Sequence, residues 1–177
     1  MAYTLLLGGA RSGKSAMAQR LALASARPVV VVATAEANDA EMVERIRLHR
    51  EERPVGWRTI EAPLELREAI GGLSRDSFIV LDCLTLWVSN LLGAGRSAEA
   101  IIATASEVAA DLATRRGVVV TNEVGLGIVP ANELARAFRD ALGAVNARFA
   151  AAAERSVLMV AGCALPLEDA AALLQIP

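Results

Sequence analysis

The segment GGARSGKS at residues 8–15 matches the pattern G-x-x-x-x-G-K-S, and it constrains the fold more than any other stretch. The apolar run TLLL precedes it, and the helix-forming segment KSAMAQRLALA overlaps its end. Glycines in such a loop let the backbone amides turn inward and form an anion-binding nest at a helix N-terminus. The segment therefore predicts a site for nucleotide phosphates, which comprises Gly8, Gly9, Ala10, Arg11, Ser12, Gly13, Lys14 and Ser15.

Lys14 is the single lysine of the chain. The other 17 of the 18 basic residues are arginines. In a loop of this type the lysine reaches the β- and γ-phosphates, and the Ser15 hydroxyl binds Mg²⁺. A match by chance has odds of roughly one in a hundred or less at ordinary residue frequencies. A lysine retained at this one position indicates that the loop needs it.

Short apolar runs alternate with longer segments of helical periodicity along the chain. Continuous Val, Leu and Ile runs are typical of buried parallel strands, and strands that alternate with helices predict a parallel sheet. We expect strands at 3–8, 28–35, 77–82, 117–123 and 156–162, with a weaker candidate at 57–61, and helices at 14–26, 39–52, 64–73, 84–93, 97–115 and 131–154. The predicted fold class is α/β, P-loop NTPase-like, with a mostly parallel central sheet flanked by helices on both faces. No linker interrupts the pattern, so we expect one domain over residues 1–177.

Composition and charge exclude several classes of function. The formal net charge of -2 gives no basic field for nucleic acid, and a small-molecule partner is favoured. No run of eighteen apolar residues predicts a membrane span, and the N-terminus lacks the basic region of a secretory signal. We therefore expect a cytoplasmic protein. Cys83 and Cys163 stand apart from each other and from histidine, so we expect reduced, buried thiols and neither a disulfide nor a zinc site.

Polar residues follow several of the expected strands. Ligands of open α/β sheets gather at the carboxyl ends of the strands, which makes Thr34, Glu36, Glu61, Asp82 and Glu123 candidate site residues. Asp82 closes the run FIVLD, where an acidic side chain would reach Mg²⁺ directly or through water. The N-K-x-D motif that reads guanine in small GTPases is absent, since Lys14 is the only lysine. A small-molecule kinase is favoured over a regulatory GTPase.

His49 is the single histidine, and it lies in RIRLHREERP near the end of an expected helix. Arg45, His49 and Arg53 are spaced four residues apart and would share one helix face, and we expect Pro54 to end the helix. One interpretation is a surface histidine stabilised by the helix dipole. The other is a nucleophile that attacks phosphorus, with arginines stabilising the charge on the phosphate oxygens. A kinase needs no such intermediate, whereas a nucleotidyltransferase does.

Three segments together resemble one family. GGARSGKS, DAEMVERIRLHREERPVGWRTIE and TNEVGLGIVPANELARAFRDALGAVNARFAAAAE are similar to the bifunctional adenosylcobinamide kinase/adenosylcobinamide-phosphate guanylyltransferase of cobalamin biosynthesis, with a likeness from about residue 4 to residue 162. The resemblance implies phosphorylation of the aminopropanol hydroxyl of adenosylcobinamide with ATP or GTP. It then implies transfer of GMP from GTP, through a histidine, to adenosylcobinamide phosphate, which gives adenosyl-GDP-cobinamide. It also implies a homotrimer.

The resemblance assigns roles to individual residues. It makes His49 the guanylylated residue and residues 8–15 the phosphate loop. It further implies nucleotide contacts by Thr34, Ala35, Glu36, Arg50, Glu51, Glu52, Arg53, Glu61 and Asp82. Glu123 resembles part of the family's site without an assigned role. The expected substrates are ATP, GTP, adenosylcobinamide and its phosphate, with Mg²⁺ on Ser15 and Asp82 as the cofactor.

Two alternatives remain open from the sequence. A single-activity P-loop kinase of another metabolite would phosphorylate its substrate without forming a covalent GMP adduct. A non-catalytic GTP-binding sensor would bind GTP without turnover. The histidine among arginines favours neither of them, because neither needs a nucleophile there.

Overall fold

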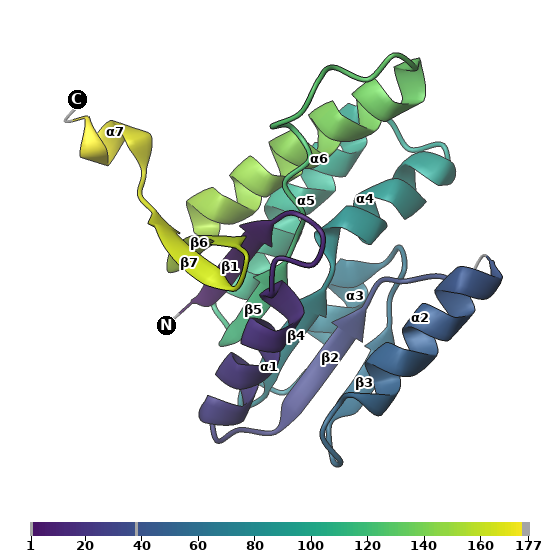
Figure 1. Cartoon of the computed structure of the whole chain (residues 1–177). Helices are drawn as coiled ribbons and strands as arrows, with labels where there is room; N and C mark the ends of the chain where they lie inside the picture. The colour runs from purple at the N-terminus through teal and green to yellow at the C-terminus, as the bar shows by residue number, and fades with distance from the viewer. Residues whose placement is uncertain (1, 38, 175–177) are drawn as a thin grey trace.

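A computed structural model of the chain describes residues 2–37 and 39–174, and a seven-stranded sheet lies at its centre (Figure 1). The strands are β1 (Tyr3–Gly8), β2 (Val29–Ala33), β3 (Arg58–Glu61), β4 (Phe78–Asp82), β5 (Gly117–Val120), β6 (Arg155–Val160) and β7 (Cys163–Leu167). Their order is β3-β2-β4-β5-β1-β6-β7, and every pair is parallel except β6 with β7. The predicted α/β class with a mostly parallel sheet is confirmed.

Helices cover both faces of this sheet. They are α1 (Lys14–Ala24), α2 (Ala40–Glu51), α3 (Leu66–Gly71), α4 (Leu84–Gly93), α5 (Ala98–Ala113), α6 (Glu133–Ala152) and α7 (Ala170–Leu173). Side chains alternate along β1, so that Leu6 packs in a cluster with Ala18 and Ala22 of α1. Its neighbours Leu5 and Leu7 belong to the larger core on the other face, which α3, α4, α5 and α6 cover.

Four of the described helices follow a residue whose side chain accepts a hydrogen bond from an amide three positions later, among them α7, which Asp169 caps through Ala172. Asp39 caps α2 through Met42, Ser97 caps α5 through Ala100, and Asn132 caps α6 through Ala135. The expected bounds of α1 to α6 all lie within two residues of the observed ones. The helix α2 ends at Glu51, shortly before Pro54, so Arg53 lies just beyond it.

The structure corrects the expectations in three places. Strands β2 and β5 end at Ala33 and Val120, earlier than predicted, because the polar residues that follow leave the sheet at its carboxyl edge. Strand β7 and helix α7 were not predicted; β7 pairs only with β6, and all five of its residues are exposed. Cys163 lies in that exposed strand, so the expectation of a buried thiol is wrong for it, whereas Cys83 is partly buried.

Within the described residues, no helix combines the length and the apolar character needed to cross a membrane.

Candidate active site

The glycine-rich segment forms a loop between β1 and α1, as its sequence predicts. Gly13 adopts a left-handed conformation with φ of 99°, and Lys14 begins α1 immediately after it. The Lys14 ammonium donates to the carbonyl oxygens of Gly8 at 2.8 Å and Gly9 at 2.7 Å, and to Ser12 Oγ at 3.3 Å. The lysine is therefore held against the loop that would surround the phosphates.

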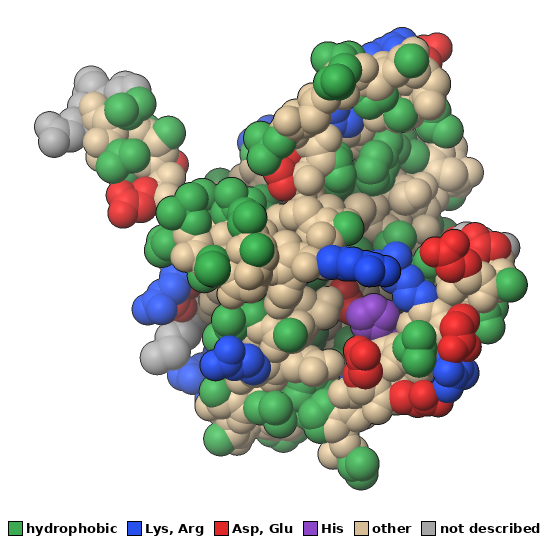
Figure 2. All heavy atoms as spheres, in the orientation of Figure 1, with side chains coloured by type: hydrophobic (Ala, Val, Ile, Leu, Met, Phe, Trp, Pro, Cys, Tyr) green, Lys and Arg blue, Asp and Glu red, His purple; other side chains and the backbone are tan. Residues whose placement is uncertain are grey.

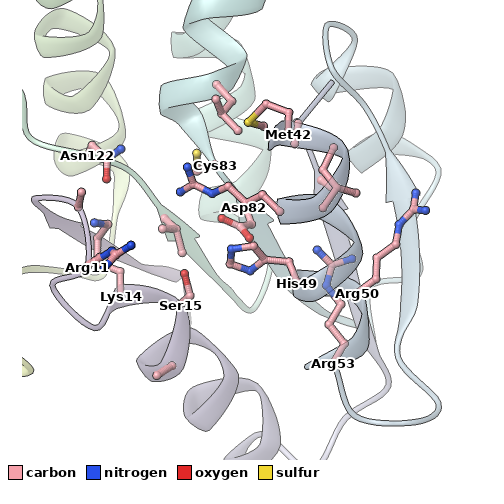
Figure 3. A pocket seen from close by; sticks show the side chains of 18 of the residues that line it. Arg11, Lys14, Ser15, Met42, His49, Arg50, Arg53, Asp82, Cys83 and Asn122 are labelled. Atoms are coloured by element: carbon pink, nitrogen blue, oxygen red, sulfur yellow. The ribbon is translucent and has the colours of Figure 1, made fainter. Parts of the chain in front are cut away.

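A cavity of about 340 Å³ opens between this loop and α2. The residues that line it on the loop side run from Ala10 to Ala16, and Asp82 lies at its base at the end of β4. On the opposite side the wall comes from α2 and the residues after it, including His49 and Arg53. Figure 3 shows this arrangement, with Lys14 and Ser15 across the cavity from the His49 imidazole.

Helix α2 presents a mixed polar and apolar face to the cavity, from Met42 and Ile46 to His49, and none of its twelve residues is buried. Arg50 forms an ion pair with Glu61 at the end of β3, and Arg53 Nη1 donates to Thr59 Oγ1 at 2.9 Å. These contacts join α2, and Arg53 just beyond its C-terminal end, to the edge strand β3. Figure 2 shows the single histidine in a hollow of the surface with basic side chains beside it.

The cavity is strongly cationic, because five basic side chains and two carboxylates line it. Burial lowers the pKa of Lys14, and the nearby Cys83 and Asp82 partly oppose this shift. Burial also lowers the pKa of Arg53, which the Asp82 carboxylate opposes and Arg50 reinforces. Burial and the Asp82 charge raise the pKa of the Cys83 thiol to about 11, so this thiol stays neutral at pH 7. An excess of positive charge is what a polyphosphate requires.

The structure brings most of the predicted site residues into this one cavity. Besides His49 and Asp82, those that line it are Ala10, Arg11, Ser12, Gly13, Lys14, Ser15, Ala35, Arg50, Arg53 and Glu61. They come from five separate stretches of the chain. The fold therefore brings the phosphate loop and the histidine block together although they are far apart in the sequence.

Other predicted site residues do not line the cavity wall. These are Gly8, Gly9, Thr34, Glu36, Glu51, Glu52 and Glu123. The buried Thr34 hydroxyl donates to the Cys83 carbonyl at 2.7 Å and accepts from the Cys83 amide at 2.9 Å, which ties the end of β2 to that of β4. Glu51 pairs with Arg47 on α2, and Glu123 accepts a hydrogen bond from the Gly125 amide. Nucleotide contacts by these residues stay predictions.

Several lining residues were not among the predicted site residues. Arg45 and Asn122 carry polar groups into the wall, and Met42, Ile46 and Leu86 give it an apolar part. The sequence indicates Arg45 only as a neighbour of His49 on one helix face. Asn122 precedes Glu123 at the same strand end, and the pattern alone gave no reason to prefer one over the other.

The donor set of the cavity is compatible with Mg²⁺. Ser15 and Asp82 both line the cavity, and they offer the hard oxygen ligands that this ion prefers. No cluster of three or more His, Cys, Asp or Glu side chains that could hold a metal occurs in the described part of the chain.

A glycine-rich loop that joins a strand to a helix, with an acidic side chain at a strand end of a parallel sheet, defines the P-loop nucleotide-binding proteins. Residues 4–167 match the family described as Cobinamide kinase / cobinamide phosphate guanyltransferase. The chain belongs to this family of transferases. The match extends five residues beyond the likeness seen in the sequence and includes β7.

Three relatives align with this chain over nearly their whole length. The Bifunctional adenosylcobalamin biosynthesis protein CobP of Pseudomonas aeruginosa is 41% identical, with 93% of this chain and 96% of that protein covered. The Bifunctional adenosylcobalamin biosynthesis protein CobU of Salmonella typhimurium is also 41% identical, over 93% and 98%. The protein of the same name from Escherichia coli is 38% identical, with the same coverage.

A distant solved structure shares the fold. The flagellar accessory protein FlaH of Methanocaldococcus jannaschii superposes with a TM-score of 0.51 at 13% identity, covering 94% of this chain and 78% of that one. At this identity the likeness concerns the arrangement of the sheet and helices alone.

Proposed function

We propose that this chain phosphorylates adenosylcobinamide with ATP or GTP and then transfers GMP from GTP, through His49, to adenosylcobinamide phosphate. The product is adenosyl-GDP-cobinamide. The observation that carries the proposal is that the phosphate loop and the single histidine line opposite sides of one cationic cavity. Both activities then use one domain, residues 1–177, and one nucleotide site.

In the guanylyl step the His49 imidazole attacks the α-phosphorus of GTP. A P–N bond forms, the bond from the α-phosphorus to the bridging oxygen breaks, and pyrophosphate leaves with the electron pair. An oxygen of the cobinamide phosphate then attacks the same phosphorus, and the P–N bond breaks to restore the imidazole. Arg53 lines the cavity with His49 and stabilises the charge on the phosphate oxygens, whereas the Arg50 guanidinium is paired with Glu61.

In the kinase step the substrate hydroxyl attacks the γ-phosphorus, and the nucleoside diphosphate leaves. Lys14 and the loop amides neutralise the charge that develops on the phosphate oxygens. Ser15 and Asp82 would hold Mg²⁺, which neutralises phosphate charge when bound. The remaining predicted nucleotide contacts, from Thr34 and Glu36 to Glu51 and Glu52, belong to the same proposal, and Glu123 keeps no assigned role.

We further propose a homotrimer, following the resemblance to the family. Exposed apolar side chains in the loop after β5, such as Leu126 and Ile128, and in the C-terminal segment, such as Leu173, are consistent with an interface between copies. Light scattering should give three times the chain mass of 18.5 kDa, and a monomer mass would overturn the proposed trimer.

Because its substrates include ATP and GTP, we also propose a cytoplasmic location.

Product analysis of wild type and His49→Ala tests the function. With adenosylcobinamide, GTP and Mg²⁺, wild type should form the phosphate and then the GDP derivative. His49→Ala should accumulate adenosylcobinamide phosphate, with GMP transfer reduced about 10³-fold or more. Leu48→Ala changes an exposed neighbour outside the cavity wall and should behave as wild type. GDP derivative formed by His49→Ala at the wild-type rate would place the nucleophile elsewhere, and no phosphate from wild type would exclude the kinase.

A further inference from the structure

Asn122 lies in the cavity wall on the side of the phosphate loop, and the family resemblance gives it no role. It stands two residues past the end of β5, which pairs with β4 on one side and with β1 on the other. Asp82 of β4 is in register with Val120 of β5. Asn122 therefore follows the strand that lies between β4, which carries Asp82, and β1, which leads into the phosphate loop. Figure 3 shows Asn122 near Arg11 and Lys14, with His49 across the cavity.

The backbone of Asn122 is held from both sides by side chains. Its amide donates to Thr85 Oγ1 at 2.7 Å, and its carbonyl accepts from Asn146 Nδ2 at 3.0 Å. Asn146 Oδ1 accepts in turn from the Thr121 hydroxyl at 2.7 Å. Two other elements, α4 and α6, therefore fix the backbone conformation at this one position.

Asn146 is an unusual residue for its place in the fold. It lies on the buried face of α6 with an exposure of 4%, between the apolar neighbours Val145 and Phe149. A buried carboxamide destabilises the fold unless it is hydrogen-bonded, and both of its printed bonds go to the segment after β5. The polar group in the core thus serves to position Thr121 and Asn122.

The side chain of Asn122, in contrast, makes no hydrogen bond to any residue that the structure describes. Its backbone is fixed, its carboxamide reaches the cavity wall, and the donors and acceptors of that carboxamide are available. A polar side chain that lines a cavity, has no partner in the described residues and stands on a fixed backbone is suited to bind a ligand there.

We propose that the Asn122 carboxamide donates a hydrogen bond to the transferring γ-phosphoryl group in the kinase step, and that Asn146 and Thr85 are its positioning residues. This inference rests on the proposed kinase activity. In that step the bond from the substrate oxygen to the γ-phosphorus forms, and the bond from the γ-phosphorus to the β–γ bridging oxygen breaks. The diphosphate takes the electron pair, and the hydroxyl proton passes to solvent. Asn122 neutralises charge on a non-bridging oxygen and exchanges no proton.

The geometry separates this role from guanylyl transfer. Lys14, which acts on the β- and γ-phosphates, lies on the Asn122 side of the cavity, whereas the α-phosphorus must reach His49 on the other side. A defect at Asn122 should therefore reduce the kinase step far more than the formation of the GMP–histidine adduct.

The test measures both steps in the same preparations of wild type, Asn122→Ala and Asn122→Asp. Kinase turnover is followed with adenosylcobinamide, and guanylyl transfer with adenosylcobinamide phosphate supplied directly. We expect kinase kcat to fall about 10²-fold in both variants, with the nucleotide KM changed by less than about threefold in Asn122→Ala and raised in Asn122→Asp, whose carboxylate repels the phosphate. The rate of guanylyl transfer should fall at least tenfold less. Ser106→Ala, an exposed polar truncation on α5, is the control.

The possible results are distinct. Kinase kcat equal to wild type in Asn122→Ala, or a parallel loss of both activities, overturns the inference. A wild-type protein without kinase activity instead overturns the proposed function, and the inference with it.

The positioning role of Thr85 is tested by comparing Thr85→Val with Thr85→Ser, because only serine keeps the acceptor for the Asn122 amide. Valine should lower kinase kcat at unchanged KM and serine should restore it, whereas equal losses in both would show a packing role.

Discussion

The only lysine and the only histidine of the chain face each other across the cavity. Lys14 is fixed by the carbonyl oxygens of its own loop, and His49 extends from α2 on the opposite wall. Neither residue type occurs elsewhere in a chain that uses arginine for its other cations. The pairing follows from chemistry, since an ammonium binds phosphate as a point charge while an imidazole forms a bond to phosphorus.

At the residue scale, the two adjacent loop glycines differ sharply in the room around them. A Cβ on Gly8, where φ is +149°, would lie 2.3 Å from the Met159 carbonyl oxygen, whereas a Cβ on Gly9 would meet nothing within 4 Å. We expect Gly8→Ala to lower the free energy of unfolding by about 2 kcal/mol or more, and Gly9→Ala by less than about 0.5 kcal/mol. Urea denaturation of both variants measures this, and equal midpoints would refute the steric account.

The loop residues and His49 could be predicted as a site because each lies in a local sequence motif, and the structure places residues 10–15 and His49 in one cavity. Sequence reasoning did not select Asn122 over Glu123, because that choice depends on which side chain the segment after β5 turns into the cavity. The hydrogen bonds of Thr85 and Asn146 with the Asn122 backbone determine that orientation, and both residues are more than twenty positions away from Asn122. No local pattern contains that contact.

At the element scale, α2 stands apart from the other long helices. Helix α5 buries five residues, among them Ile101 and Val108, whereas α2 buries none. The contacts described for α2 are polar: the Asp39 cap and the ion pair from Arg50 to Glu61. Most helical stability in proteins comes from packing of an apolar face, so this helix is the less stable of the two.

Hydrogen exchange should show this difference directly. In the nucleotide-free protein we expect amides of α2 to exchange at least about tenfold faster than those of α5, because local opening of α2 exposes little apolar surface. GTP should slow exchange in α2, since the phosphates would contact its cationic face. The account of α2 is wrong if its peptides are as protected as those of α5 before nucleotide is added.

The elements that the sequence predicted best are those with strong internal signals. Apolar runs predicted β1, β4 and β6, and helical spacing with helix-forming residues predicted α5 and α6. Strand β7 was missed because CALPL contains a proline and lies at the sheet edge with both faces exposed. A strand held only by pairing with β6 carries no burial pattern from which to recognise it.

At the scale of the whole molecule, the strand order explains how distant segments share one site. The parallel strands β2, β4, β5 and β1 end at the same edge, and the order β3-β2-β4-β5-β1 places the phosphate loop, Asp82 and Glu61 along it. Sequence reasoning could predict that edge from the α/β alternation. The position of α2 opposite the loop could not be predicted, since this helix buries no residue that would mark the surface on which it packs.

The central claim is that His49 carries GMP between two substrates, and covalent labelling tests it most directly. Wild type, His49→Ala and the control Leu48→Ala are incubated with α-³²P-GTP and Mg²⁺ and then denatured. We expect label that survives denaturation, resists base and is lost in acid in wild type and Leu48→Ala, and no label in His49→Ala. Equal label in His49→Ala, or no label on a wild-type protein that binds GTP, would contradict the account.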